Sequence, residues 1–112
     1  MITFNSLSTY FPAGSFEFVG NSQVKLNISA MTGDSLTLDS EAIKAIYTIL
    51  DSLVTATNGI NSDRAAQTPP LAPVTLASKV LTGTVAQPGY EYKVDFIVDS
   101  STFLNNLKDP TV

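Results

Sequence analysis

The chain has 112 residues, enough for one domain with a single hydrophobic core. Hydrophobic residues make up 44% of the chain and charged residues 14%, a balance that argues against disorder of the whole chain. The net charge is -4 at pH 7, and the 6 Lys and Arg residues lie singly along the sequence, so no basic cluster predicts nucleic-acid binding. We therefore expect residues 1–112 to form a single domain without nucleic acid as a partner.

Residues 1–14 form an N-terminal arm that is rich in aromatic side chains. Residues 2–4 predict a short edge strand. A following turn of helix, ended by a proline, would place Leu7, Tyr10 and Phe11 on one side. The arm can fold back on its own core, which the Ala-Gly pair at its end favours, or lie on a neighbouring subunit in an assembly.

Two runs of alternating polarity follow at residues 15–19 and 23–29, and the Gly-Asn pair between them is typical of a hairpin turn. A two-residue loop would pair apolar with polar side chains. A three-residue loop over residues 20–22 matches apolar side chains across the hairpin, so we expect this register. The apolar pairs that it predicts are Phe18 with Val24 and Phe16 with Leu26.

Residues 39–58 carry the only long helical pattern, with apolar side chains recurring every three or four residues. One helix face is therefore expected to be buried. That face consists of Ile43, Ile46, Tyr47, Leu50, Leu53 and Val54. Asp39 is expected to cap the helix, and Leu38 to pack on Ile43 as a hydrophobic staple. Asn58-Gly59 predicts that the helix ends here, with a residue in the left-handed backbone conformation.

Residues 59–73 predict an exposed loop, because they contain a proline pair, the only arginine and almost no periodicity. Loops of this length are often functional or disordered. Two interpretations stay open. The segment can be a simple crossover that returns the chain to a sheet, or an extended arm, stiffened by its prolines, that docks on a partner.

A second hairpin is predicted from residues 74–85 and 90–98, with Pro88-Gly89 at the centre of the turn. The predicted cross-strand pairs, which agree in polarity, are Val85 with Tyr92, Gly83 with Val94, Leu81 with Phe96, Thr84 with Lys93 and Thr82 with Asp95. Tyr90 and Tyr92 fall on the same face of their strand as Val94 and Phe96. We therefore expect both tyrosine rings to belong to the core. Residues 100–108 predict a short helix that ends before a proline.

The predicted fold is α+β: an antiparallel sheet of two hairpins with one main helix packed across it, in the order ββαββ, plus a short C-terminal helix. The start of the chain has no basic region followed by an apolar run, and no stretch approaches about 18 consecutive apolar residues. We therefore expect a soluble protein without a signal peptide or a transmembrane segment, made in a cytoplasm.

Catalytic chemistry finds little support in this sequence. Without cysteine or histidine, a triad would lack its usual base, and none of the common phosphate-binding, hydrolase or metalloprotease motifs occurs. The carboxylates that could bind a cation are Asp34, Asp39 and Glu41. Those that alternate on one strand and could in principle flank a glycoside are Glu91, Asp95 and Asp99. Roles in turns and helix caps account for the first three. The other three are expected on the solvent-exposed face of a sheet. We predict a non-enzymatic protein with no catalytic residue, cofactor or metal.

Four short motifs in the first half of the chain resemble those of small virion-associated proteins of tailed phages and prophages. The motifs are Ile2-Thr3-Phe4, Gly14-Ser15-Phe16-Glu17-Phe18, Lys25-Leu26-Asn27-Ile28 and Thr32-Gly33-Asp34, followed by the helix. The resemblance implies a capsid decoration (cement) protein, or another small head or tail component, located in the virion. Its implied partners are subunits of the major capsid protein or other virion proteins.

Composition points the same way, since a small chain with few charges and an apolar arm suits a protein that binds other protein subunits. A homo-oligomer around a symmetry axis is expected. The residues expected to bind partners are Phe4, Leu7, Tyr10, Phe11, Pro69, Pro70, Leu71 and Pro73. Two alternatives remain: a recognition module that binds a peptide or glycan around Thr82, Thr84, Lys93 and Asp95, and a small tail or neck subunit.

Overall fold

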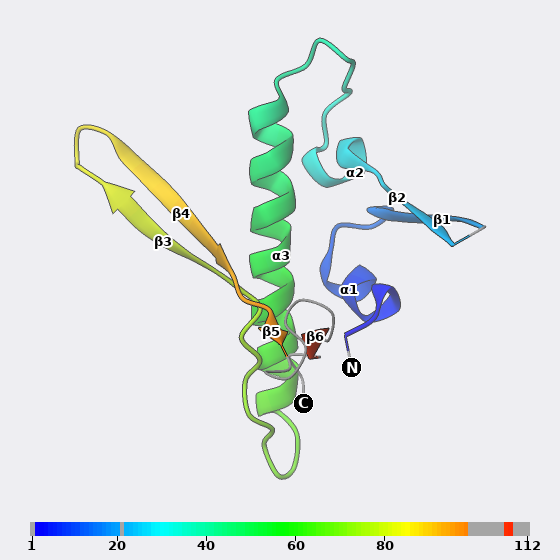
Figure 1. The fold of residues 1–112 in the computed structure, drawn as a ribbon, viewed down its shortest axis with the longest axis vertical. Helices are drawn as coiled ribbons and strands as arrows, with labels where there is room; N and C mark the ends of the chain where they lie inside the picture. The colour runs from blue at the N-terminus through cyan, green and yellow to red at the C-terminus, as the bar shows by residue number, and fades with distance from the viewer. Residues whose placement is uncertain (1, 21, 99–106, 109–112) are drawn as a thin grey trace. The chain divides into compact units, whose positions relative to one another are not determined.

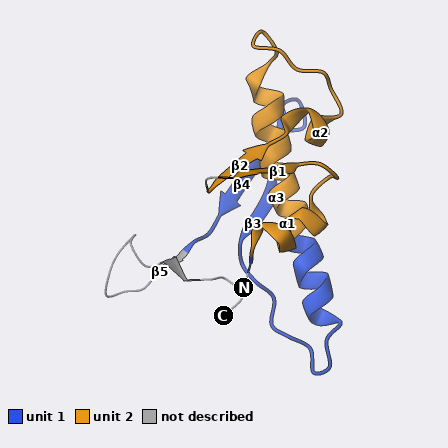
Figure 2. Cartoon of the chain, turned by 90° about the vertical axis from the view of Figure 1, so that its right-hand side faces the viewer, with its two compact units in different colours: residues 1–2, 57–112 blue, residues 3–56 orange. Residues whose placement is uncertain are grey.

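A computed structural model describes residues 2–20, 22–98 and 107–108 of the chain. Within these residues the protein is a mixture of helices and strands, with one long helix and several short antiparallel hairpins (Figure 1). The chain divides into two compact units, Thr3–Ala56 and Met1–Ile2 with Thr57–Val112 (Figure 2). The boundary falls within the long helix, and each unit is described by itself. That all 112 residues form a single domain stays a prediction.

The first unit begins with helix α1, Phe4–Tyr10. Its start is a capping box: the Thr3 hydroxyl accepts the Ser6 N–H at 3.1 Å, and the Ser6 hydroxyl accepts the Thr3 N–H at 2.8 Å. The predicted strand over residues 2–4 is therefore wrong, because Thr3 serves as the N-cap of a helix. The predicted end is confirmed, since Phe11 caps α1 and a proline follows.

Strands β1 (Phe16–Gly20) and β2 (Gln23–Leu26) form the first hairpin. Phe18 lies opposite Val24 and Phe16 opposite Leu26, so the register expected from the apolar faces is confirmed. The middle residue of the predicted loop, Asn21, lies outside the described residues.

The predicted second strand is too long, because it ends at Leu26 and not at Ser29. The Asn27 side chain accepts the Ala30 N–H at 3.0 Å and thereby caps helix α2, Ile28–Thr32. Gly33 ends α2 with a φ of +76°, a conformation that glycine adopts at little cost. The expected turn at residues 32–34 is thus the end of a helix.

The core of this unit is small and centres on Phe11, Met31 and Ala56. Partly buried side chains from all three helices and from β1 pack against it: Leu7, Tyr10, Phe16, Ile28, Ile49 and Leu53. The arm therefore folds back on its own unit through most of its apolar side chains, as the intramolecular interpretation predicted.

Helix α3 spans Ala42–Ala65, so both predicted ends are wrong. It begins three residues after Asp39, which is therefore not its N-cap. Leu38 is fully exposed and Ile43 is 76% exposed, so the predicted staple does not form. The helix also continues through Asn58-Gly59, although an internal glycine costs about 1 kcal/mol relative to alanine.

Burial and side-chain hydrogen bonds beyond Gly59 explain why α3 continues. Ile60 is buried in the second unit. The Asn61 side chain accepts the N–H of Val74 at 2.7 Å and donates to its carbonyl at 3.1 Å. These interactions join the last turns of α3 to a segment thirteen residues further along the chain, a link that local helix signals do not report.

Strands β3 (Ala77–Gly83) and β4 (Pro88–Val94) form the second hairpin, but in a different register from the one predicted. Tyr92 lies opposite Lys79 and not opposite Val85, a shift of six residues. The turn is Thr84 to Gln87, and the Pro-Gly pair begins β4. Because the shift is even, each side chain keeps its predicted face.

Gly83 explains the observed turn. Its φ is +81°, and a Cβ atom there would lie 2.3 Å from the carbonyl oxygen of Gln87, so only glycine fits. The sequence predicted the turn at Pro88-Gly89. The chain turns instead directly after Gly83, where the backbone needs a positive φ and close contact with Gln87.

The described part of the chain ends with strands β5 (Ile97–Val98) and β6 (Leu107–Lys108), which pair antiparallel. Residues 100–106 of the predicted C-terminal helix lie outside the described residues, and the last two residues of that helix form β6. The described strands make three separate two-stranded sheets, and the ββαββ packing of one helix across a common sheet is not confirmed. None of the described helices is long and apolar enough to cross a membrane.

Candidate functional site

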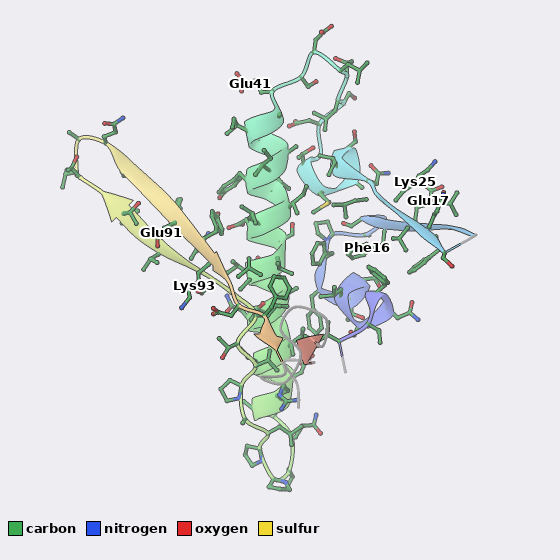
Figure 3. The ribbon with its side chains drawn as sticks, in the orientation of Figure 1. Phe16, Glu17, Lys25, Glu41, Glu91 and Lys93 are labelled. Atoms are coloured by element: carbon green, nitrogen blue, oxygen red, sulfur yellow. The ribbon has the colours of Figure 1, made fainter. Side chains whose placement is uncertain are left out.

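Phe4, Phe16 and Phe18 form an aromatic cluster on α1 and β1. The Phe4 ring meets those of Phe16 and Phe18 edge to face, with centroids 6.0 and 6.1 Å apart. The ring of Phe16, labelled in Figure 3, also packs on that of Phe11, and the two ring centroids lie 4.9 Å apart, which anchors the cluster in the core. Phe4 is 51% exposed and Phe18 57% exposed, so the cluster presents aromatic surface to solvent.

The structure separates the four residues of the arm that were expected to bind a partner. Phe11 is buried, and Leu7 and Tyr10 are partly buried against the core. Only Phe4 presents most of its ring to solvent. Phe18 was not expected on this exposed surface, because its pairing with Val24 predicts a buried face. Its parity with Phe16 could have indicated a shared aromatic face.

The first turns of α3 carry a second exposed apolar surface, made of Ile43, Ile46 and Tyr47. These residues were expected in the core. The periodicity of the helix was identified correctly, but Ile43 is 76% exposed, Ile46 52% and Tyr47 43%. An ion pair between Lys44 and Asp34 joins this end of α3 to the segment after α2.

Between α1, α2 and α3 the first unit has a groove of about 430 Å³. Phe11 and Met31 contribute apolar surface, while α3 contributes polar side chains, among them Asp51 and Ser52. No group of three or more carboxylate, histidine or cysteine side chains gathers anywhere in the described residues to hold a metal ion. The groove therefore offers a mixed apolar and polar lining.

The loop residues expected to bind a partner are Pro69, Pro70, Leu71 and Pro73, and all four are exposed. The loop folds back on the end of α3. The N–H of Leu71 donates to the carbonyl of Arg64 at 3.0 Å, and the Arg64 Nε donates to the carbonyl of Ala72 at 2.6 Å. The loop thus acts as a crossover that presents Leu71 at the surface, while docking on a partner stays a prediction.

The residues of the alternative recognition site are brought together only in part, since Lys93 forms an ion pair with Asp95 but lies apart from Thr84. Thr84 lies in the turn of the second hairpin, where it bonds to Gln87, whereas Lys93 lies opposite Ser78. Ser78 and Thr84 are six residues apart on one strand and its turn, which corresponds to about 20 Å. The predicted ladder of Thr82, Thr84, Lys93 and Asp95 is therefore wrong.

The second hairpin is exposed along most of its length. Val80, Leu81 and Tyr90 are each more than half exposed, so the prediction that Tyr90 belongs to the core is wrong, while Tyr92 is partly buried. Lys79 places its ammonium group 4.9 Å from the centre of the Tyr90 ring. Asp99, from the predicted carboxylate series, lies outside the described residues.

Comparison of the chain with protein-family models, with curated proteins and with solved structures finds no match.

Proposed function

We propose that this chain is a non-enzymatic structural protein that assembles with other protein subunits, and that it serves as a virion component such as a capsid decoration (cement) protein. The observation that carries the proposal is the distribution of apolar side chains. Among the described residues, the buried hydrophobic side chains number seven, two of them alanines. Fourteen large hydrophobic side chains are exposed, far more than the scattered few that need no explanation.

Two of the exposed surfaces suit a protein partner. The aromatic cluster offers rigid rings with little conformational entropy to lose, which is typical of interface anchors. The Leu71 side chain stands on a loop held by two hydrogen bonds to Arg64, one from the Leu71 N–H to the Arg64 carbonyl and one from the Arg64 Nε to the Ala72 carbonyl, so its position is organised before binding. A decoration protein joins neighbouring subunits through several modest contacts of this kind and gains strength from multivalency.

The resemblance of the first half of the chain to small virion-associated proteins supports a capsid as the place of assembly, with the major capsid protein as partner. The exposed rings of Phe4 and Phe18 lie within the segments that carry this resemblance.

The test is whether the chain occupies virus particles. Particles are purified by density gradient from cells that carry the gene, and the chain is quantified by mass spectrometry. A decoration protein is present in many copies, in fixed ratio to the major capsid protein. Particles lacking the gene product should then bind the purified chain in a sedimentation assay. Absence of the chain from the particles refutes the proposal.

Point substitutions identify the surface in that assay, because deleting the arm would also remove Phe11 from the core. Burying the exposed part of one Phe ring contributes about 1–2 kcal/mol, so Phe18→Ser should weaken binding roughly tenfold. Glu17→Ser, on the opposite face of the same strand, is the matched control and should leave binding unchanged. Equal effects of the two substitutions would exclude the aromatic cluster as the binding surface.

A further inference from the structure

The groove of the first unit has two walls of different chemistry. Helices α1 and α2 lie on the same side of α3 (Figure 1), and the apolar wall comes from Phe11, the C-cap of α1, and from Met31 of α2. The polar wall comes from four residues of α3: Thr48, Asp51, Ser52 and Thr55. They are spaced by three, four and seven residues from the first, a spacing that places them on one face of the helix. The groove is therefore apolar on one side and polar on the other.

The polar wall offers hydrogen-bond acceptors. The Thr48 hydroxyl donates its proton to the Lys44 carbonyl at 2.8 Å, so its oxygen is left to accept. Asp51 contributes a carboxylate, and Ser52 and Thr55 contribute hydroxyl oxygens. Among the described residues that line the groove none is Lys or Arg, and only Asp51 carries a charged side chain. This wall therefore matches a ligand that is positively charged and rich in donors.

We propose that the groove binds the side chain of an arginine that a partner protein subunit presents. A guanidinium group is cationic and planar, with five N–H donors and no acceptor, so it complements a wall of carboxylate and hydroxyl oxygens. Its flat face and aliphatic stem suit the opposite wall of Phe11 and Met31, because arginine stacks on aromatic rings and packs its stem on apolar surface. The groove volume of about 430 Å³ falls within the range of ligand pockets, about 300–1,000 Å³.

Asp51 does not have to be without a partner to bind this group. It already takes part in an interaction within the chain. A carboxylate has two oxygens with about four acceptor positions, so Asp51 can receive a guanidinium N–H while it keeps that interaction. The inference deepens the proposed function, on which it rests, by naming the chemistry of the residue that a partner subunit places on this chain.

Titration of the isotope-labelled chain with N-acetyl-arginine amide, followed through the backbone amide signals by NMR, tests the proposal. The signals of the groove residues should shift and saturate with a dissociation constant in the millimolar range, as expected for so small a ligand. N-acetyl-citrulline amide has the same shape, but it has no charge and replaces one donor group by an acceptor, so it should bind at least tenfold more weakly. Equal binding of the two compounds, or the absence of saturating shifts at the groove, overturns the inference.

N-acetyl-lysine amide separates the guanidinium group from charge alone. Lysine carries the same charge without the planar fork of donors, so this compound should bind several times more weakly than the arginine derivative. Lysine binding as tight as that of arginine overturns the assignment of the groove to arginine.

Asp51→Asn removes the charge from the polar wall and should raise the dissociation constant of the arginine derivative at least tenfold. Its matched control is Asp39→Asn, the same change of charge at an exposed position before α3, which should leave binding unchanged. Because Asp51 also has an interaction within the chain, circular dichroism checks that the variant is folded. A folded Asp51→Asn variant that binds as tightly as the wild type overturns the inference.

Thr55→Lys tests the same wall without changing Asp51. Lysine is a good helix former and Thr55 is exposed, so this substitution adds a positive charge at the groove at little cost to the helix. Arginine binding should weaken at least tenfold, whereas Ala66→Lys, the same added charge just after α3, should leave it unchanged. Equal effects of the two substitutions contradict the proposal.

These titrations use the isolated chain, and none of them depends on virus particles. A groove that does not bind arginine leaves the presence of the chain in particles unaffected. Failure of this inference is therefore distinguishable from failure of the proposed function.

Discussion

Phe11 and Phe4 belong to the same aromatic arm, but Phe11 is buried and Phe4 is half exposed. Phe11 is 9% exposed and packs with Met31 and Ala56, so Phe11→Ala leaves a cavity in a small core. A buried Phe→Ala substitution costs about 3–5 kcal/mol, a large part of the 5–15 kcal/mol by which a domain is stable. Phe4 is half exposed and keeps two edge contacts, so Phe4→Ala should cost only about 1–2 kcal/mol.

The assay is urea unfolding followed by circular dichroism and tyrosine fluorescence. With a slope of about 1–3 kcal/mol per M, Phe11→Ala should lower the midpoint by roughly 2 M and Phe4→Ala by less than half of that. Partner binding should respond in the reverse order when measured on the folded proteins. Equal losses of stability for the two variants would refute the assignment of Phe11 to the core, and a larger loss for Phe4→Ala would reverse it.

The remaining predictions concern backbone positions in the second unit and one matched turn. Gly83→Ala should destabilise the second hairpin by more than about 1 kcal/mol, because the added Cβ would meet the Gln87 carbonyl. Gly20→Ala, which has open space around it, should cost about 1 kcal/mol. Thermal unfolding compares the two variants, and equal decreases in melting temperature contradict the prediction. Asn61→Ala should cost about 1–3 kcal/mol, since the buried Val74 loses both backbone partners. Asn61→Asp keeps the acceptor and should cost less; a loss as large as that of alanine would show that the donated bond matters most.

The exposure of the candidate binding residues was predictable only in part. The exposed loop residues follow from composition, because prolines without periodicity indicate a surface segment. The exposed Phe18 and Ile43 were not predictable, because both sit in patterns that normally mark a buried face. A sequence pattern shows that side chains share a face, and only packing shows whether another element covers it.

The sequence by itself determined the features that depend on neighbours a few residues apart. The register of the first hairpin followed from matching Phe18 to Val24, and the end of α1 from the proline after Phe11, because strand parity and proline geometry act locally. The register of the second hairpin differs from the predicted one by six residues. Because this number is even, each side chain stays on its predicted face of the hairpin.

Only the tertiary structure decided where α3 ends and how the second hairpin is paired. Helix α3 passes the Asn-Gly signal because Ile60 is buried and Asn61 bonds to Val74, contacts whose free energy exceeds the cost of one internal glycine. The hairpin turns at Gly83 because close contact with Gln87 excludes every other residue there. In both places a local propensity of about 1 kcal/mol competed with contacts that only the folded chain forms, and the contacts prevailed.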